Sequence, residues 1–208
     1  MTLDRLERPA IGDPAGALVL LHGRGADERD LFSLLDLLDP DRRLLGFTPG
    51  GPLALPPGGR HWYRLGGIPT PDPETFSASA ALIAELVDGL PVAPERVVIG
   101  GFSQGAVMSW ATALAPGRPR VAGIIALSGF MHRVPGFELD LTRLAGLPVA
   151  VAHGSLDPVI PASFSTEAAR VAEASGAKLV QFETPVPHTI DSAWLPGLQQ
   201  LVREALPG

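Results

Sequence analysis

Several residue types and patterns are scarce or missing in this chain of 208 residues. Cysteine is absent, which excludes disulfides, thiol chemistry and enzymes built on a Cys–His pair. No apolar run approaches the roughly 20 residues needed to cross a bilayer. Residues 1–8 alternate in charge and lack the apolar core of a secretory signal. We therefore expect a cytoplasmic protein with no stable membrane insertion.

Positive charge is in deficit. The chain has 16 lysines and arginines against 22 aspartates and glutamates, a formal net charge of −6. A negative protein is repelled by phosphate backbones and by anionic headgroups. Nucleic acids and anionic membrane surfaces are therefore not expected partners. The sequence is compatible with a homo-oligomer and leaves the oligomeric state open.

Metal-binding patterns are also missing. There is no H-E-x-x-H motif, and the five histidines lie in five separate segments. His153 and Asp157 are close in the sequence, but a histidine at a strand end before Gly-Ser is better explained by a structural role. We expect no metal and no cofactor.

The composition that remains favours one folded domain over residues 1–208. The chain is 46% hydrophobic and 18% charged, and we find no repeat or linker. Strand-like and helix-like segments alternate, which is typical of an α/β fold with a mostly parallel central sheet and helices on both faces. The expected strands cover residues 17–21, 97–99, 123–127, 148–152 and 178–182.

Two later segments have apolar residues at helical spacing, and we assign both to the core. These residues are Phe164, Ala168, Val171 and Ala172 in the first segment, and Trp194, Leu198, Leu201 and Val202 in the second. The main irregular segment covers residues 49–73 and contains seven of the 22 prolines. It is too short for a separate cap domain.

The most informative motif is Gly-Phe-Ser-Gln-Gly at residues 101–105, between an expected strand and an expected helix. A serine flanked by glycines on such a turn is typical of a nucleophile elbow. The bend forces an unfavourable backbone on Ser103, and side chains at Gly101 or Gly105 would collide with the neighbouring strand and helix. It also leaves the N–H of Gln104 at the first turn of a helix, where it favours an oxyanion. The alternative is a glycine-rich turn with an incidental serine.

Chain order selects the partners of Ser103. In hydrolases with this elbow, the acid and then the histidine follow the serine. Asp157 lies just past the strand at 148–152, where parallel sheets build their sites, and His188 is then the remaining histidine downstream. Asp140 is the rival acid, but no clear strand precedes it. Alone, Asp157 reads as a turn former and His188 as a loop histidine.

A second oxyanion donor is expected in the loop after the first buried strand. The sequence there is His-Gly-Arg-Gly at residues 22–25, and its two glycines let the backbone approach a ligand. We assign the donor to the N–H of Arg24. A dinucleotide-binding loop is excluded because Glu28 stands where that motif has its third glycine.

Taken together, these residues resemble the phospholipase/carboxylesterase family of small α/β-hydrolases, which includes acyl-protein thioesterases and bacterial carboxylesterases. The resemblance spans nearly the whole chain. Its matching segments are Leu-His-Gly-Arg-Gly at 21–25, Arg-His-Trp-Tyr at 60–63, Gly-Gly-Phe-Ser-Gln-Gly at 100–105, Leu-Ser-Gly-Phe at 127–130, His-Gly-Ser-Leu-Asp-Pro-Val-Ile-Pro at 153–161 and His-Thr-Ile at 188–190.

The resemblance implies an α/β-hydrolase fold with a triad of Ser103, Asp157 and His188, and an oxyanion hole formed by the Arg24 and Gln104 amides. Acyl-protein thioesterases usually have leucine where Arg24 stands, so the chain is more similar to the bacterial carboxylesterases. The Arg24 side chain is expected to favour polar or anionic substrates. Expected residues of the substrate cleft are Trp62, Tyr63, Phe130 and Met131, although Trp62 fits a core-anchoring role equally well.

The predicted activity is hydrolysis of a small-molecule carboxylic ester through an acyl-enzyme on Ser103, with thioesters or lysophospholipid-type esters as further substrates. Acyl transfer to an acceptor other than water uses the same residues and is the first alternative. A catalytically inactive binding module is the second, and the intact triad argues against it. Peptidase activity is disfavoured because no cap or second domain is expected to select peptides.

Overall fold

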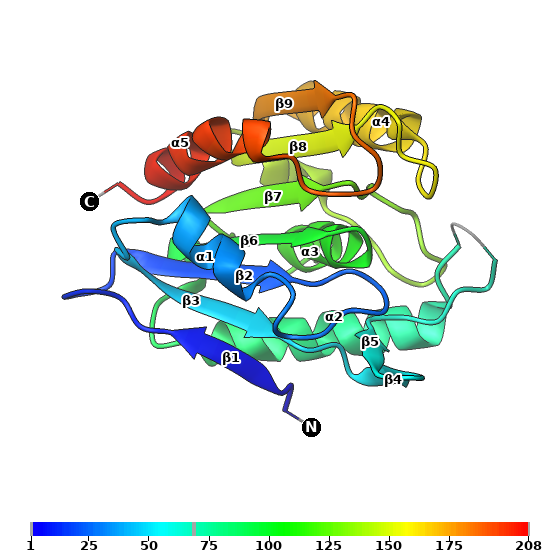
Figure 1. The fold of residues 1–208 in the computed structure, drawn as a ribbon, viewed down its shortest axis with the longest axis horizontal. Helices are drawn as coiled ribbons and strands as arrows, with labels where there is room; N and C mark the ends of the chain where they lie inside the picture. The colour runs from blue at the N-terminus through cyan, green and yellow to red at the C-terminus, as the bar shows by residue number, and fades with distance from the viewer. Residues whose placement is uncertain (1, 68–69, 208) are drawn as a thin grey trace.

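A single sheet of seven strands forms the centre of the molecule (Figure 1). The computed structural model describes residues 2–67 and 70–207. The strands are mutually parallel except the first, which pairs antiparallel to β3 at one edge. Their order across the sheet is β1 (Arg5–Arg8), β3 (Leu44–Pro49), β2 (Gly16–Leu21), β6 (Val97–Phe102), β7 (Gly123–Leu127), β8 (Pro148–Gly154) and β9 (Lys178–Thr184). This is the mostly parallel sheet that the sequence predicts.

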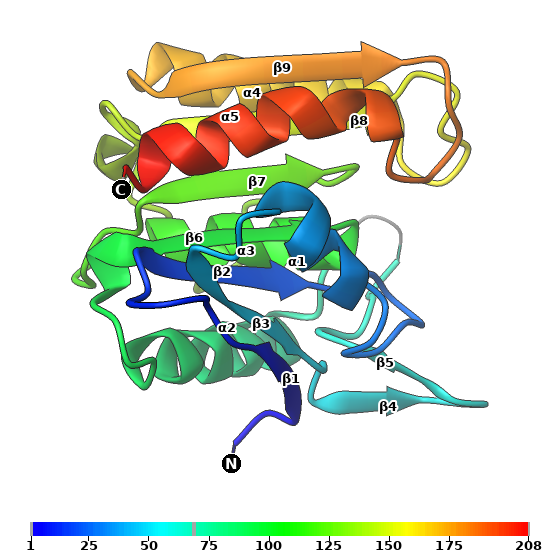
Figure 2. The ribbon, with the colours of Figure 1, turned by 60° about the vertical axis from the view of Figure 1, so that its left-hand side comes forward.

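Helices cover both faces of the sheet, as Figures 1 and 2 show. One face packs against α2 (Pro73–Asp88), α3 (Gln104–Leu114) and α4 (Ala162–Ala174). The other packs against α1 (Phe32–Leu38) and α5 (Leu195–Ala205). Short 3-10 helices lie at Pro94–Arg96, Leu141–Leu144 and Ser192–Trp194. Two apolar cores therefore share one sheet, and the predicted α/β fold is confirmed.

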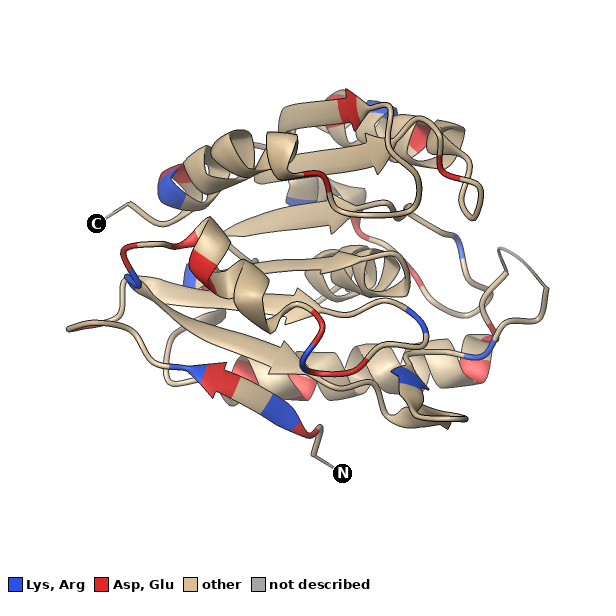
Figure 3. Cartoon of the chain, viewed as in Figure 1, with Lys and Arg blue, Asp and Glu red and all other residues tan. Residues whose placement is uncertain are grey.

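The central strands are apolar because both of their faces are covered. Every residue of β2 and β7 is buried. Figure 3 shows no charged residue on β2, β6, β7 or β8. Parallel strands place their carboxyl ends at one edge of the sheet, so the loops that follow these four strands meet there.

The helical stripes agree with the sequence in α5 and only partly in α4. Trp194, Leu198, Leu201 and Val202 are all buried. In α4, Ala168 and Ala172 are buried, but Phe164 is 36% exposed. The Phe164 ring lies on that of Phe130, with ring centroids 5.3 Å apart, and not inside the core.

The proline-rich segment at residues 49–73 contains a small hairpin of β4 (Leu53–Leu55) and β5 (Gly59–His61). The hairpin lies beside the loop that follows β2, since the Gly25 N–H donates to Arg60 O at 2.8 Å and the Arg60 N–H donates to Ala26 O at 2.8 Å. In its described part, the segment is a support for that loop and does not form a cap domain. No helix in the described chain is both long and apolar enough to span a membrane.

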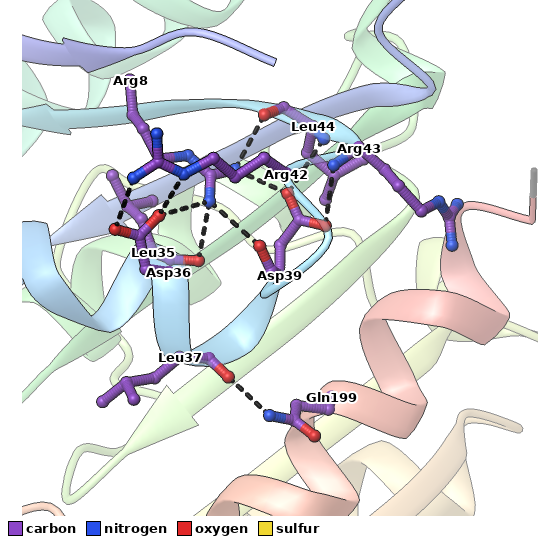
Figure 4. Close-up of polar contacts among 9 residues, drawn as sticks. All are labelled: Arg8, Leu35, Asp36, Leu37, Asp39, Arg42, Arg43, Leu44 and Gln199. Atoms are coloured by element: carbon purple, nitrogen blue, oxygen red, sulfur yellow. Dashed lines mark hydrogen bonds and ion pairs between the residues drawn. The ribbon is translucent and has the colours of Figure 1, made fainter. Parts of the chain in front are cut away.

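A buried ion pair fixes the edge strand β1 to helix α1 (Figure 4). Arg8 Nη2 lies 2.6 Å from Asp39 Oδ2, and both side chains are more than 90% buried. The guanidinium also donates to the carbonyl oxygens of Leu35 and Leu44, at 3.1 and 2.8 Å. Buried charges require such partners, because desolvation without them costs several kcal/mol.

Candidate active site

Ser103 occupies a sharp turn between β6 and α3. Its φ of 54° and ψ of −117° fall where L-residues are strained, as a nucleophile elbow requires. A Cβ at Gly101 would lie 2.5 Å from both Leu21 O and the backbone of Gly105, and one at Gly105 would overlap Leu21 O. The flanking glycines are therefore needed where the elbow meets strand β2 and helix α3.

Asp157 and His188 come from two loops that meet at the same edge of the sheet. His188 Nδ1 lies 2.5 Å from Asp157 Oδ2, across 31 residues of chain. Asp157 Oδ1 accepts the N–H groups of Val159 and Ile160 at 2.8 and 2.9 Å. The Asp157 carboxylate is fully buried, whereas the His188 side chain is 17% exposed. This geometry leaves His188 Nε2 as the ring nitrogen available for other chemistry.

Asp157 is suited to stay ionised. Burial alone would raise its pKa, but hydrogen bonds from the Ile160 N–H, His188 and the Val159 N–H together outweigh burial and lower the pKa below its usual value. A carboxylate in this position orients the imidazole and stabilises its cation.

The ring of His188 is also held from the side by Phe102. The two ring centroids are 4.7 Å apart, with an interplanar angle of 43°. Phe102 is the last residue of β6 and precedes Ser103 directly. The strand residue that supports the His188 ring is therefore the immediate neighbour of Ser103 in the chain.

The loop after β2 is held by His22, which is buried. The N–H of Gly51 donates to His22 Nε2 at 2.9 Å, so the proton of a neutral ring is on Nδ1, which donates to Gly23 O at 2.6 Å. Burial lowers the pKa of His22, which favours this neutral form. A Cβ at Gly23 would lie 3.5 Å from Ser103 Cβ. The backbone leading into Arg24 is thus fixed beside the serine.

A cleft of about 330 Å³ joins these groups. Its walls are mainly apolar, and Arg24 is the exposed cation among them. The Arg24 side chain forms no hydrogen bond or ion pair with the described residues. No hydrogen bond joins Ser103 to His188 in the described structure, and in unliganded enzymes such bonds often tighten only with substrate. The cleft is lined by Arg24, Tyr63, Leu65, Ser103, Gln104, Val107, Phe130, Val159, Ile160 and His188.

Two residues expected in the cleft lie elsewhere. Trp62 is fully buried and donates through Nε1 to His22 O at 2.8 Å, so it anchors the core. Met131 lines a neighbouring cavity of about 510 Å³ together with His132 and Glu138. Phe130 and Met131 are consecutive in the chain but line different cavities. Tyr63 and Phe130 do line the cleft.

The rival acid, Asp140, is outside the cleft. It caps the 3-10 helix at Leu141–Leu144, where its Oδ1 accepts the Thr142 N–H at 3.1 Å. The described residues contain no group of three or more His, Asp or Glu side chains that could hold a metal ion.

Sequence reasoning missed two supporting side chains. The side-chain amide of Gln104 bonds the backbone of Trp62 and Tyr63. His153 lies 3.1 Å from Asp157 Oδ2 through Nε2. The close spacing of His153 and Asp157 in the sequence was the signal for the second contact. The position of His153 at a strand end does not predict which way its side chain points.

The fold and the site geometry define an α/β hydrolase. A family model described as Phospholipase/Carboxylesterase matches residues 9–203, so the chain belongs to this family. Its members act on ester bonds, and the chain is an enzyme of the serine hydrolase class.

Individual relatives agree with the family. Acyl-protein thioesterase 1 of Candida albicans is 28% identical over an alignment 213 residues long, which covers 88% of this chain and 89% of that protein. The crystal structure of esterase PE8 has 28% identity and a TM-score of 0.82, covering 99% of this chain and all of that one. The Bacillus cereus carboxylesterase, at 20% identity, matches in fold with a TM-score of 0.79, covering 98% of this chain and 94% of that one.

Proposed function

We propose that this protein is a carboxylesterase that hydrolyses small esters through an acyl-enzyme on Ser103. The observation that carries the proposal is the short contact between His188 Nδ1 and the buried Asp157 carboxylate, at 2.5 Å, beside a serine held at a φ of 54°. A strained serine and a histidine that line one cleft, with a buried acid bonded to the histidine, form the constellation that acyl transfer needs.

In the proposed acylation step, His188 Nε2 takes the Ser103 proton as the hydroxyl attacks the ester carbonyl. Asp157 keeps the proton of His188 on Nδ1 and stabilises the imidazolium. The N–H groups of Arg24 and Gln104 donate hydrogen bonds to the carbonyl oxygen as negative charge develops on it. The imidazolium then protonates the alcohol, which leaves.

In the second step, His188 activates a water molecule, which attacks the acyl-enzyme and releases the acid. The same oxyanion donors serve both steps. The buried Asp157 keeps its orienting role, since its hydrogen bonds from Val159 and Ile160 do not depend on substrate.

The cleft favours a short acyl chain. Its volume of about 330 Å³ lies near the lower end of the range for small-molecule sites. Apolar side chains, among them Val107, Phe130 and Ile160, form its walls. One relative in the comparison is an acyl-protein thioesterase, so thioesters are the second substrate class to test.

The test combines labelling with turnover. A fluorophosphonate should add once per chain, peptide mapping should place the adduct on Ser103, and a p-nitrophenyl ester series should show an optimum at short acyl chains. Ser103→Ala should lower kcat by about 10⁴-fold to 10⁶-fold. Ser109→Ala is the matched control because Ser109 is a buried serine on the helix that follows Ser103 and does not line the cleft.

The outcomes separate the alternatives. Near-normal turnover by Ser103→Ala would contradict the assignment. A new ester formed with added alcohol, at the expense of the acid product, would favour acyl transfer. Neither adduct nor turnover would favour an inactive binding module.

A further inference from the structure

The buried carboxylate of Asp157 lies between two histidines. His188 Nδ1 and His153 Nε2 both contact the same oxygen, Oδ2, at 2.5 and 3.1 Å. His153 is 2% exposed, so water does not compete for its ring. His188 faces the cleft, whereas His153 does not line it. The mechanism proposed above uses the first histidine and gives the second no role.

The hydrogen bonds around His153 fix where its protons are. Ser165 Oγ donates its single proton to Gly129 O, which can only accept. The contact between His153 Nδ1 and Ser165 Oγ, at 2.5 Å, therefore requires a proton on Nδ1. On the opposite side, Nε2 faces Ile160 O at 2.9 Å and Asp157 Oδ2 at 3.1 Å, which are both acceptors. Both ring nitrogens must donate.

The other groups around His153 do not supply a second charge at bonding distance. Its register partner on the neighbouring strand, Glu183, is exposed. Helix α4 presents the neutral Ser165, and the loop after β7 presents the carbonyl of Gly129. Asp157 and, beyond it, His188 are the ionisable groups in the network. The balancing charge for a doubly protonated ring is thus the Asp157 carboxylate.

We propose that His153 is a positioning residue that acts as a buried imidazolium, donating through Nε2 to the catalytic carboxylate. It fixes Oδ2 for His188 and shares the negative charge of Asp157. Sharing that charge weakens the electrostatic attraction of the carboxylate for a proton on the neighbouring imidazole, so loss of the His153 charge should be visible in the pH dependence of turnover. This inference rests on the proposed function.

Two variants test the charge and the position separately. His153→Gln removes the charge, and its side-chain amide keeps a donor for Asp157. His153→Leu removes both the charge and the donor. We expect His153→Leu to lose about tenfold in kcat with KM within about twofold, and His153→Gln to recover part of that loss.

A third variant tests the protonation without touching Asp157 or His153. In Ser165→Ala, His153 Nδ1 loses its acceptor and the ring should become neutral while Nε2 still donates. In both His153→Gln and Ser165→Ala, the acid limb of the kcat/KM profile for a neutral p-nitrophenyl ester should move to higher pH by about half a unit or more. Thr166→Ala is the control, since this neighbouring hydroxyl bonds only Ala162 O on its own helix.

Nitrogen-detected NMR of the wild-type protein supplies the direct readout. Two N–H signals that vanish together in His153→Gln are expected at neutral pH. A single protonated ring nitrogen, or an acid limb that stays in place in Ser165→Ala, would overturn the proposal. Fluorophosphonate labelling at high pH should remain one per chain in every variant, so that loss of the Ser103 chemistry itself is recognised separately.

Discussion

Gln104 holds Trp62 through its side chain. Its Oε1 accepts the Trp62 N–H at 3.1 Å, and its Nε2 donates to Tyr63 O at 3.0 Å. Trp62 in turn donates to His22 O at 2.8 Å. The residue that starts helix α3, the wall of the cleft and the loop after β2 are therefore one hydrogen-bonded unit.

Removing this side chain should weaken the unit while keeping the backbone N–H. Gln104→Ala leaves the buried N–H of Trp62 without its partner, so we expect a loss of about 1–3 kcal/mol in the free energy of unfolding. We also expect roughly a tenfold fall in kcat/KM as the cleft wall shifts. Denaturant titration and ester kinetics measure the two effects. Gln104→Glu keeps the acceptor for Trp62 but replaces the donor to Tyr63 O with a buried carboxylate oxygen, so it should lose at least as much stability as Gln104→Ala, and a smaller loss would contradict the role of the bond to Tyr63.

Arg24 should determine preference for charged esters. Its exposed guanidinium lines the cleft and has no partner among the described residues. Arg24→Leu keeps the backbone N–H and should lower the kcat/KM ratio of a carboxylate-bearing ester to its neutral analogue by about threefold to tenfold, with the difference shrinking at high salt. Arg133→Leu serves as the control because Arg133 lines the neighbouring cavity. An unchanged ratio in Arg24→Leu would remove this role.

Stability should fall on mild acidification because of His22. Burial lowers the pKa of His22, so the unfolded chain takes up a proton at a pH where the folded protein does not. Protons then favour the unfolded state, and the free energy of unfolding falls as pH drops below the usual histidine range, by at most about 1.4 kcal/mol per pH unit for one such group. Urea titrations between pH 7.5 and 5.5 measure this slope. His22→Gln should show a shallower slope, and an identical one would contradict the assignment.

The buried pair of Arg8 and Asp39 makes an asymmetric prediction. Arg8→Met leaves Asp39 buried without its cation and should destabilise the fold by about 3–5 kcal/mol. The double variant Arg8→Met, Asp39→Leu removes both charges and should recover part of that loss; the rest remains because the N–H groups of Arg43 and Leu44 lose their acceptor. Denaturant titration of the wild type, the single variants Arg8→Met and Asp39→Leu, and the double variant decides the matter, and additive losses in the double variant would contradict a coupled pair. Turnover of the folded protein should stay unchanged, because neither residue lines the cleft.

The strands that build the site were predictable because they are covered on both faces. Their continuous apolar runs at β2, β6, β7 and β8 are local signals, and the glycines around Ser103 mark the turn. The sequence also paired Asp157 with His188, from chain order and from the position of Asp157 just past a strand end, and their catalytic roles stay predictions. The assignment of residues 1–208 to one domain and the cytoplasmic location stay predictions.

What the sequence did not indicate depends on distant partners. β1 has the sequence Arg-Leu-Glu-Arg, a charged segment without strand character. Arg8 is buried because it pairs with Asp39, and this partner is 31 residues away in the chain. The contact of His153 with Asp157 likewise needs the rotamer that Ser165 on α4 imposes. Phe164 shows the reverse case, since its helical spacing predicts core while the ring rests on Phe130 at the surface.

The contact between Phe102 and His188 ties the His188 ring to the strand that leads into Ser103. Phe102, which packs against His188, is covalently joined to Ser103, so a displacement of the end of β6 would carry the serine and the support of the histidine together. Substitutions in loops that contact neither residue should therefore leave the position of the His188 ring relative to Ser103 unchanged.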